Sequence, residues 1–156
     1  MADKVKPIPD GYHSVTPYLI VNGAAKAIEF YKKAFGATEL GSMPQPDGRI
    51  AHAELQIGDS RVMLADEFPE RGYHGPEKYG GSAVTLHLYV EDVDQVASRA
   101  VAAGAKLLRP VEDQFYGDRS GVLADPFGHH WNVSTHIEDL TMEEIGNRAA
   151  KAMGQG

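Results

Sequence analysis

The sequence predicts an α+β protein built from two βαβββ modules. The order strand, helix, strand, strand, strand can be followed twice along the chain. Gly58 and Gly128, the glycines of two predicted hairpins, lie 70 positions apart, and Gly36 and Gly104, which end two predicted helices, lie 68 apart. Each module would cover one face of a four-stranded sheet with its helix and leave the other face open. We therefore expect two curved mixed sheets that pair and form a cleft.

The first module is predicted over residues 13–66, after an N-terminal arm of residues 1–12. Its first strand is expected at Val15–Val21, at a sheet edge, because Pro17 has no amide hydrogen to donate. Asn22 is expected to cap the helix Ala24–Phe35, whose apolar residues recur at helical spacing. The remaining strands are expected at 37–43, 50–57 and 60–65.

Residues 67–82 are rich in glycine, proline and charge, which predicts a linker loop that could also act as a lid. The second module is predicted over residues 83–136. It begins with a strand and a helix, and the Asp125–Gly128 turn joins its last two strands. Its helix is expected at 92–103, and its strands are expected at 83–90, 105–110, 119–124 and 130–135.

The C-terminal segment, residues 137–156, is predicted to contain a helix over Thr141–Met153. Thr141 and Glu144 are spaced as a capping box, in which the threonine hydroxyl accepts a hydrogen bond from the backbone amide of the glutamate.

Composition narrows the class of partner. The 156 residues carry a net charge of −7 and no basic cluster, which argues against nucleic acid and anionic membranes as partners. No cysteine is present, so disulfides, thiol nucleophiles and cysteine zinc sites are excluded. The sequence has no apolar run long enough for a membrane span and no signal-peptide pattern at its start, so we expect a cytoplasmic protein.

Strand alternation predicts which side chains line the cleft. In each strand one set of alternate residues is apolar and suits the helix side, whereas the other is polar or aromatic. A cleft that mixes aromatic and convergent polar groups is typical of a ligand site, so we expect a small-molecule ligand. The predicted lining residues on the strands are Thr16, Tyr18, His52, Glu54, Gln56, Thr85, His87, Tyr89 and Asn132.

Two further residues, Phe115 and Arg119, extend this prediction. Phe115, on a loop, could stack on a flat ligand. Trp131 could do so too, but its strand parity favours the helix-facing core. Arg119 either points into the cleft as an anion anchor or pairs with a neighbouring aspartate, Asp113 or Asp118.

Several stretches together resemble the vicinal oxygen chelate superfamily, which contains glyoxalase I, extradiol dioxygenases and bleomycin-resistance proteins. The resemblance covers roughly residues 13–148 and is strongest to the PhnB-like branch. The stretches that carry it are VTPYLIVNGAAKAIEFYKKAFGA, HAELQIGDSRVMLADE, LYVEDVDQVASRAVAAGAKLLRPV, DPFGHHWNVSTH and THIEDLTMEEI.

The resemblance implies a divalent metal bound by side chains on the first and last strand of each module. These positions fall here on Thr16, Thr85, Asn132 and Val62, or on Met63 if the register slips by one. None is a strong ligand, so we expect no metal at the usual positions and no cofactor.

A relocated metal site is the alternative. His52, Glu54 and His87 could hold Fe, Ni, Zn or Mn, and Glu54 could serve as a general base.

Two functions follow from these interpretations. The first is a metal-independent protein of the bleomycin-resistance kind that binds a small organic molecule, aromatic or cationic, in the cleft. The second is a metal-dependent lyase or dioxygenase that uses the relocated site. Because related modules pair between chains as well as within them, we also expect a homodimer.

Overall fold

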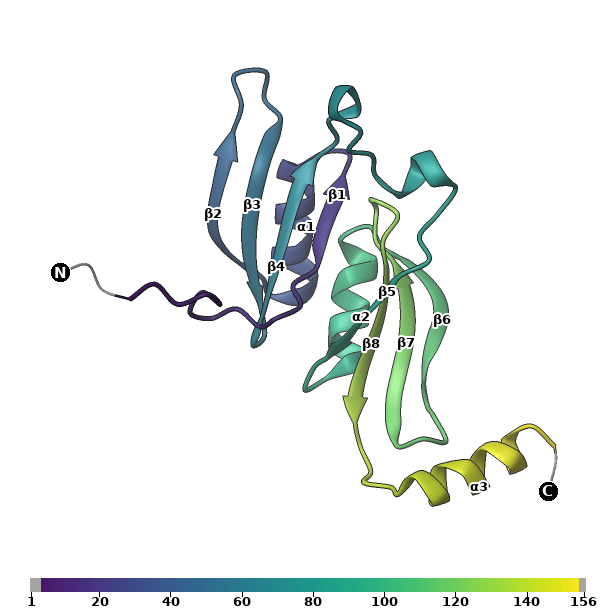
Figure 1. The fold of residues 1–156 in the computed structure, drawn as a ribbon. Coiled ribbons are helices and arrows are strands. Elements are labelled where there is room, and N and C mark those ends of the chain that lie inside the picture. Colours follow the sequence, from purple (N-terminus) through teal and green to yellow (C-terminus); the bar gives the residue numbers. More distant parts are fainter. Residues whose placement is uncertain (1–3, 155–156) are drawn as a thin grey trace. The chain divides into compact units, whose positions relative to one another are not determined.

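The computed structural model describes residues 4–154, and the chain divides into two compact units at Gly81 and Ser82 (Figure 1). Residues 1–3 of the predicted arm and residues 155–156 of the predicted C-terminal segment lie outside the described residues. Over the described range, no helix is both long enough and apolar enough to cross a membrane.

The first unit contains the first βαβββ module. Two short 3-10 helices, η1 (Pro69–Arg71) and η2 (Pro76–Tyr79), follow its last strand. The module consists of β1 (Tyr18–Val21), α1 (Ala24–Phe35), β2 (Thr38–Pro44), β3 (Ile50–Ile57) and β4 (Ser60–Asp66).

The second unit repeats this order and adds a helix, α3 (Met142–Ala152), after the module. Its module consists of β5 (Thr85–Tyr89), α2 (Val93–Ala102), β6 (Lys106–Asp113), β7 (Asp118–Ala124) and β8 (His130–His136).

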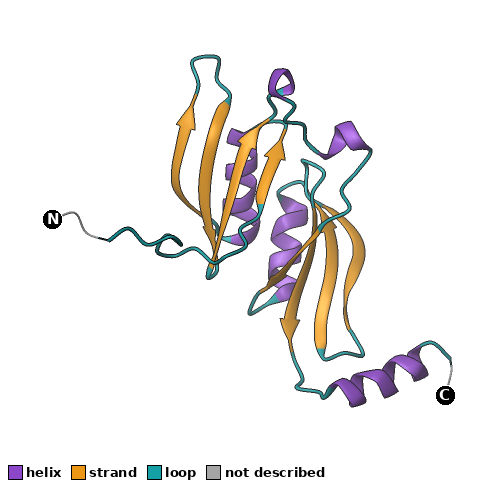
Figure 2. Cartoon of the chain, viewed as in Figure 1, coloured by secondary structure: helices purple, strands orange, loops and turns teal. Residues whose placement is uncertain are grey.

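Both sheets have the same topology, so the predicted α+β fold with two βαβββ modules is confirmed. The strand orders are β1-β4-β3-β2 and β5-β8-β7-β6. In each sheet the first strand pairs in parallel with the last, and the other neighbours are antiparallel. Each sheet has one helix packed against it (Figure 2).

One face of each sheet forms a core with its helix. The apolar residues of α1 predicted from helical spacing are buried, Tyr31 completely. They pack with alternate strand residues such as Leu55 and Leu64, which are also fully buried. In the second unit the predicted core position of Trp131 is confirmed: it is 3% exposed, and its indole N–H donates to Asp125 at 2.9 Å. The opposite face of each sheet is not covered by the helix of its module, and we refer to it as the open face.

The N-termini of α1 and α2 are held by side chains from the last strand of each module. Asp66 Oδ1 accepts from the amides of Gly23 and Ala24 at 2.9 and 2.8 Å, and Oδ2 accepts from Ile50 at 2.7 Å. Asn22 was expected to cap α1, but Gly23 occupies the N-cap position without a side-chain bond, and the distant Asp66 carboxylate accepts the free amides instead.

In the second unit Thr135 takes the equivalent role. Its hydroxyl accepts from the Val93 amide at 2.9 Å and donates to the Val90 carbonyl at 2.8 Å.

The first strand is shorter than predicted. It begins at Tyr18 rather than Val15, and β1 lies at the sheet edge as Pro17 required. The Pro17 carbonyl still accepts from Met63 at 2.9 Å. By contrast, β6 continues past Pro110 to Asp113, with register shifts on either side of Arg109 that accommodate the proline.

Residues 67–81 belong to the first unit and are folded onto it. The Glu67 amide donates to the Val21 carbonyl, and Phe68 and Tyr73 form an isolated antiparallel bridge around η1. Gly72 ends η1 at a φ of 82°, a conformation that favours glycine. Residues 68–73, which are part of the segment predicted as a linker, therefore form a closed loop in the first unit.

The C-terminal helix confirms its predicted cap. The Thr141 hydroxyl accepts from the Glu144 amide at 3.1 Å, and α3 begins at the next residue after Thr141.

Candidate functional site

The open face of the first sheet carries a chain of three hydrogen-bonded side chains. The Tyr18 hydroxyl lies 2.8 Å from His52 Nδ1, and His52 Nε2 lies 3.0 Å from Glu54 Oε2. His52 and Glu54 share a face because they are two residues apart on β3. Tyr18, on β1, reaches across the intervening β4 to meet them. The structure therefore brings three of the predicted site residues together.

The acceptor-only character of an ionised carboxylate gives these hydrogen bonds a direction. Ionised Glu54 can only accept, so His52 Nε2 carries the hydrogen of this pair. In the neutral imidazole Nδ1 then has no hydrogen and accepts from the Tyr18 hydroxyl. Glu54, predicted as a possible general base, also orients the His52 ring through this hydrogen bond.

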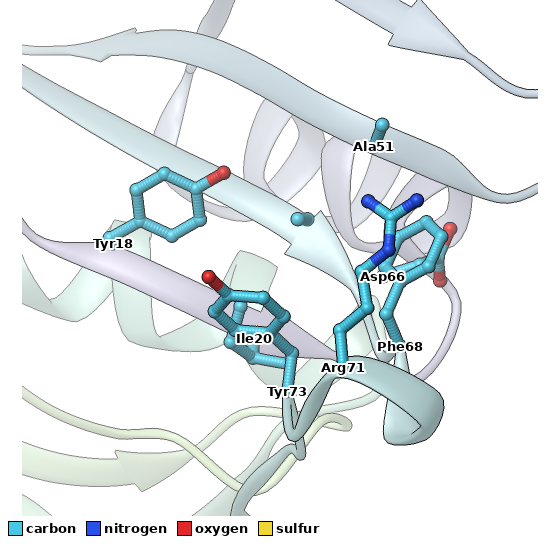
Figure 3. A pocket seen from close by; sticks show the side chains of 8 residues that line it. Tyr18, Ile20, Ala51, Asp66, Phe68, Arg71 and Tyr73 are labelled. Carbon is cyan, nitrogen blue, oxygen red and sulfur yellow. The ribbon is translucent and has the colours of Figure 1, made fainter.

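A cavity of about 570 Å³ lies beside this chain, within the first unit (Figure 3). Tyr18 and Ile20 line it from β1, whereas Arg71 and Tyr73 enter from the loop after β4. Such a volume lies within the roughly 300–1,000 Å³ typical of small-molecule sites. The full lining is Tyr18, Ile20, Ala51, Ala65, Asp66, Phe68, Arg71 and Tyr73.

The two phenols of the cavity are close enough to influence each other. Burial, and secondly the neighbouring Tyr73 phenol, raise the pKa of Tyr18 above its ordinary value. Tyr18 therefore keeps its hydroxyl hydrogen at neutral pH and acts as a hydrogen-bonding group rather than as a phenolate.

The other predicted residues of the first sheet are peripheral to this cavity. Thr16 precedes β1, and its hydroxyl donates to the His13 carbonyl at 3.5 Å. Gln56 lies on the open face, but its amide donates to the Gly58 carbonyl of the hairpin turn at 2.8 Å. Neither is among the residues that line the cavity.

The open face of the second sheet carries a different network. The Tyr89 hydroxyl donates to Asp118 at 2.7 Å, and the other oxygen of Asp118 lies 2.8 Å from His136 Nδ1. His136 Nε2 lies 2.8 Å from Asp139. The hydrogen bond to Asp118 is the main cause that raises the pKa of Tyr89, and hydrogen bonds to Asp118 and then Asp139 raise the pKa of His136.

The remaining predicted residues of the second unit lie near this network. The His87 ring is 4.7 Å from that of Tyr89, and Thr85 is exposed at the start of β5. Asn132 pairs with His87 in register, and its side-chain oxygen is buried without a hydrogen-bond partner. Phe115 lies in the turn before β7, edge-on to Tyr116.

Arg119 does not act as an anion anchor on the open face. Its guanidinium is bonded to Asp94 of α2 at 2.8 and 2.9 Å and to Asp113 at 3.0 Å, and these bonds raise its pKa. It shares strand parity with Gly121 and the buried Leu123, so it lies on the helix side of β7. Of the two predicted alternatives, pairing with Asp113 is the one observed.

The divalent metal that the resemblance implies does not fit these residues. Val62, at one of the implied positions, is buried in the helix-side core, and neighbouring Met63, which faces the open side, offers only a thioether. Among residues 4–154, no group of three or more histidine, aspartate and glutamate side chains is placed to hold a metal. In the alternative set, His52 and Glu54 hydrogen-bond each other in the first unit, whereas His87 belongs to the second.

Of the eight residues that line the cavity, sequence reasoning predicted only Tyr18. Three of the seven that it missed, Phe68, Arg71 and Tyr73, lie in residues 67–82, which were interpreted as a linker. A signal was present: two aromatic residues flank Pro-Glu-Arg-Gly, a combination that suits a tight loop. Asp118 and His136 were also missed, although both share a face with predicted site residues.

Comparisons with known proteins agree with the class that this fold defines, a pair of βαβββ modules with open sheet faces. The family model described as "Glyoxalase/Bleomycin resistance protein/Dioxygenase superfamily" matches residues 11–133. Protein Mb0911c of Mycobacterium bovis is 46% identical over 146 residues, which cover 92% of this chain and 95% of that protein.

Solved structures show the same fold. Protein PA1353 of Pseudomonas aeruginosa superposes with a TM-score of 0.65 and 26% identity, covering 81% of this chain and 99% of that one. The PhnB protein of Bacillus cereus gives a TM-score of 0.62 at 19% identity, covering 79% and 99%. The chain belongs to the glyoxalase/bleomycin resistance/dioxygenase superfamily.

Proposed function

We propose that this protein binds a small organic molecule on the open face of its first sheet and does so without the metal of related enzymes. The cavity between β1, β3, β4 and the loop 67–73 is the observation that carries this proposal. It lies within one unit, so the proposal does not depend on how the two sheets pair.

The chemistry of the lining supports a ligand with an apolar or aromatic body. Ile20, Ala51 and Ala65 supply aliphatic surface, whereas Tyr18 and Tyr73 supply aromatic rings with a hydroxyl each. A largely apolar wall with a few polar groups that fix orientation is the usual composition of a small-molecule site. The sequence predicts a ligand in a cleft between the two sheets, whereas this proposal places the ligand in the cavity of the first unit.

The test is to fill the cavity. Ala51 lies on β3 at the cavity wall and is partly exposed, so Ala51→Phe can be accommodated while it occupies ligand space. Ala124→Phe is the matched control, because Ala124 is a partly exposed residue of the second sheet. Fragments found by ligand-observed NMR should lose binding to Ala51→Phe and keep it with Ala124→Phe. Equal binding to both variants would contradict the proposed site.

The metal-dependent alternative makes a separate prediction. About one tightly held Fe, Ni, Zn or Mn per chain after dialysis, lost in His52→Ala and in His87→Ala, would support a lyase or dioxygenase and contradict the metal-independent part of the proposal. We expect metal content far below one ion per chain, because Thr16, Thr85, Asn132 and Val62 at the implied positions offer no strong metal ligand.

We also propose that the chain forms a homodimer, as the family resemblance implies. Light scattering should then give about twice the chain mass of 16.9 kDa at micromolar concentration. A mass of one chain would contradict this part.

A further inference from the structure

Arg71 stands out at the cavity because its guanidinium makes no salt bridge with a carboxylate in the described part of the chain. No ion pair involves Arg71 among residues 4–154, and its guanidinium lies 5.6 Å from the centre of the Phe68 ring. The neighbouring Arg49, 4.1 Å from the same ring, is paired with Asp47 and Glu70 at 2.9 Å each. Arg71 contributes to lowering the pKa of Glu70, but that carboxylate bonds to Arg49.

The one carboxylate that lines the cavity is already used by the fold. Both oxygens of Asp66 accept backbone amides, at 2.7 to 2.9 Å, and the residue is only 8% exposed. A carboxylate so bonded is stabilised by its amide donors and presents little free hydrogen-bonding capacity to a ligand. The charge available to a ligand in this cavity is therefore that of Arg71.

The backbone that carries Arg71 is held in place. The amide of Phe68 donates to the Tyr73 carbonyl at 2.9 Å, and the amide of Tyr73 donates back at 3.1 Å. Arg49 also ties this loop to the turn before β3 through the Glu67 carbonyl and Glu70. A preorganised loop lowers the entropic cost of placing a ligand against Arg71.

We propose that the cavity selects small organic acids, with the acidic group on Arg71 and the apolar body against Ile20 and Ala65. This inference rests on the proposed function and names the class of ligand for that site. A guanidinium matches a carboxylate through two parallel hydrogen bonds, which a neutral amide or an ammonium group cannot reproduce. The Tyr73 hydroxyl also lines the cavity and can donate to a further oxygen of the ligand (Figure 3).

A preference for acidic ligands is the opposite of the preference that the overall composition suggested. The net charge of −7 and the exposed aromatic residues suggested a cationic or planar ligand. The cavity itself has the opposite character, because both oxygens of Asp66 accept backbone amides whereas Arg71 has no carboxylate partner among residues 4–154. Local charge, rather than net charge, decides the preference at a contact distance of a few ångströms.

Three probes of similar shape separate these possibilities: phenylacetate, phenylacetamide and 2-phenylethylammonium. Their affinities for the full chain are measured by NMR titration at low ionic strength. We expect phenylacetate to bind about ten-fold more tightly than phenylacetamide, as one charge-assisted contact implies, and the ammonium probe to bind most weakly. The preference should shrink at about 0.15 M salt, where the Debye length falls to about 8 Å.

Two variants at Arg71 and one elsewhere complete the test. Arg71→Gln should bring the acid-to-amide ratio close to one while it leaves phenylacetamide binding in place, and Arg71→Lys should keep part of the preference. Arg99→Gln is the control, because Arg99 is an exposed cation of α2 in the second unit. It should leave the ratio unchanged.

The outcomes distinguish this inference from the function it rests on. Equal affinities for the three probes, a ratio that survives Arg71→Gln, or no binding of phenylacetate at millimolar concentration would each overturn the acid selection. If phenylacetamide still binds and Ala51→Phe abolishes that binding, the cavity remains a ligand site without acid selection. If Ala51→Phe leaves all binding intact, the proposed site itself is wrong.

Discussion

The two units share one topology but differ in the chemistry of their open sheet faces. Tyr18 pairs in register with Met63 in the first sheet. The residues that lie 69 positions after these two, His87 and Asn132, pair with each other in the second sheet. Asp66 and Thr135 are also 69 positions apart. Each accepts a hydrogen bond from a backbone amide at the N-terminus of the helix in its own module.

The open faces have diverged. The first presents Tyr18, His52 and Glu54 beside a cavity that a folded loop closes, whereas the second presents Tyr89 and His136 around the buried Asp118. Residues that pack a helix on a sheet are constrained by the fold, but an open face can change without loss of the core. The two modules of this chain can therefore keep one fold while the residues on their open faces differ.

The largest difference between the two units in the free energy of unfolding lost on mutation is expected at the side chains that cap α1 and α2. Asp66→Ala leaves three backbone amides of the first unit without an acceptor, so we expect a loss of about 3 kcal/mol in the free energy of unfolding. Thr135→Ala removes one acceptor and one donor in the second unit and should cost about 1 to 1.5 kcal/mol. Urea unfolding measures both. A larger loss for Thr135→Ala would contradict the comparison.

A smaller difference in the loss of stability is expected when Tyr18 and Tyr89 are replaced by phenylalanine. Tyr89→Phe removes a hydrogen bond to the carboxylate of Asp118, whose side chain is 6% exposed, and should cost about 1.5 kcal/mol. Tyr18→Phe removes a bond to His52, whose side chain is 26% exposed and can be solvated by water, so about 0.5 kcal/mol is expected. Chemical denaturation of the two variants against wild type decides the order, and equal losses would mean that burial of the partner does not matter here.

The smallest effect is a pH dependence confined to the second unit. Asp118, and then Asp139, raise the pKa of His136 above its ordinary value of about 6.5. A raised pKa in the folded state means that the protonated imidazole stabilises the fold. This contribution is fully present below pH 6.5 and is lost as pH rises through the raised pKa.

His136→Gln should therefore lower the urea midpoint more at about pH 6 than at about pH 9. The single tryptophan, Trp131, lies in the second unit and makes its fluorescence a suitable probe. His74→Gln is the control, because this histidine lies in the first unit, outside the Asp118 network. A midpoint difference that does not change with pH would rule out this linkage.

Local patterns in the sequence predicted much of the molecule. The module order, both module helices, the cap of α3 and the core position of Trp131 follow from periodicity, turn residues and capping residues close together in the chain. Strand parity also predicted that His52 and Glu54 share a face. The same parity, applied to Leu123 and Gly121, would have placed Arg119 on the helix side.

The sequence by itself determined the repeated βαβββ fold and which residues of each strand face away from the helix, because these depend on local periodicity. Only the tertiary structure decided which of those residues meet. Asp66 instead of Asn22 holds α1, and the loop with Arg71 and Tyr73 folds back over the first sheet to complete a cavity. Such contacts depend on register and loop closure between residues far apart in the chain, and no local pattern encodes them.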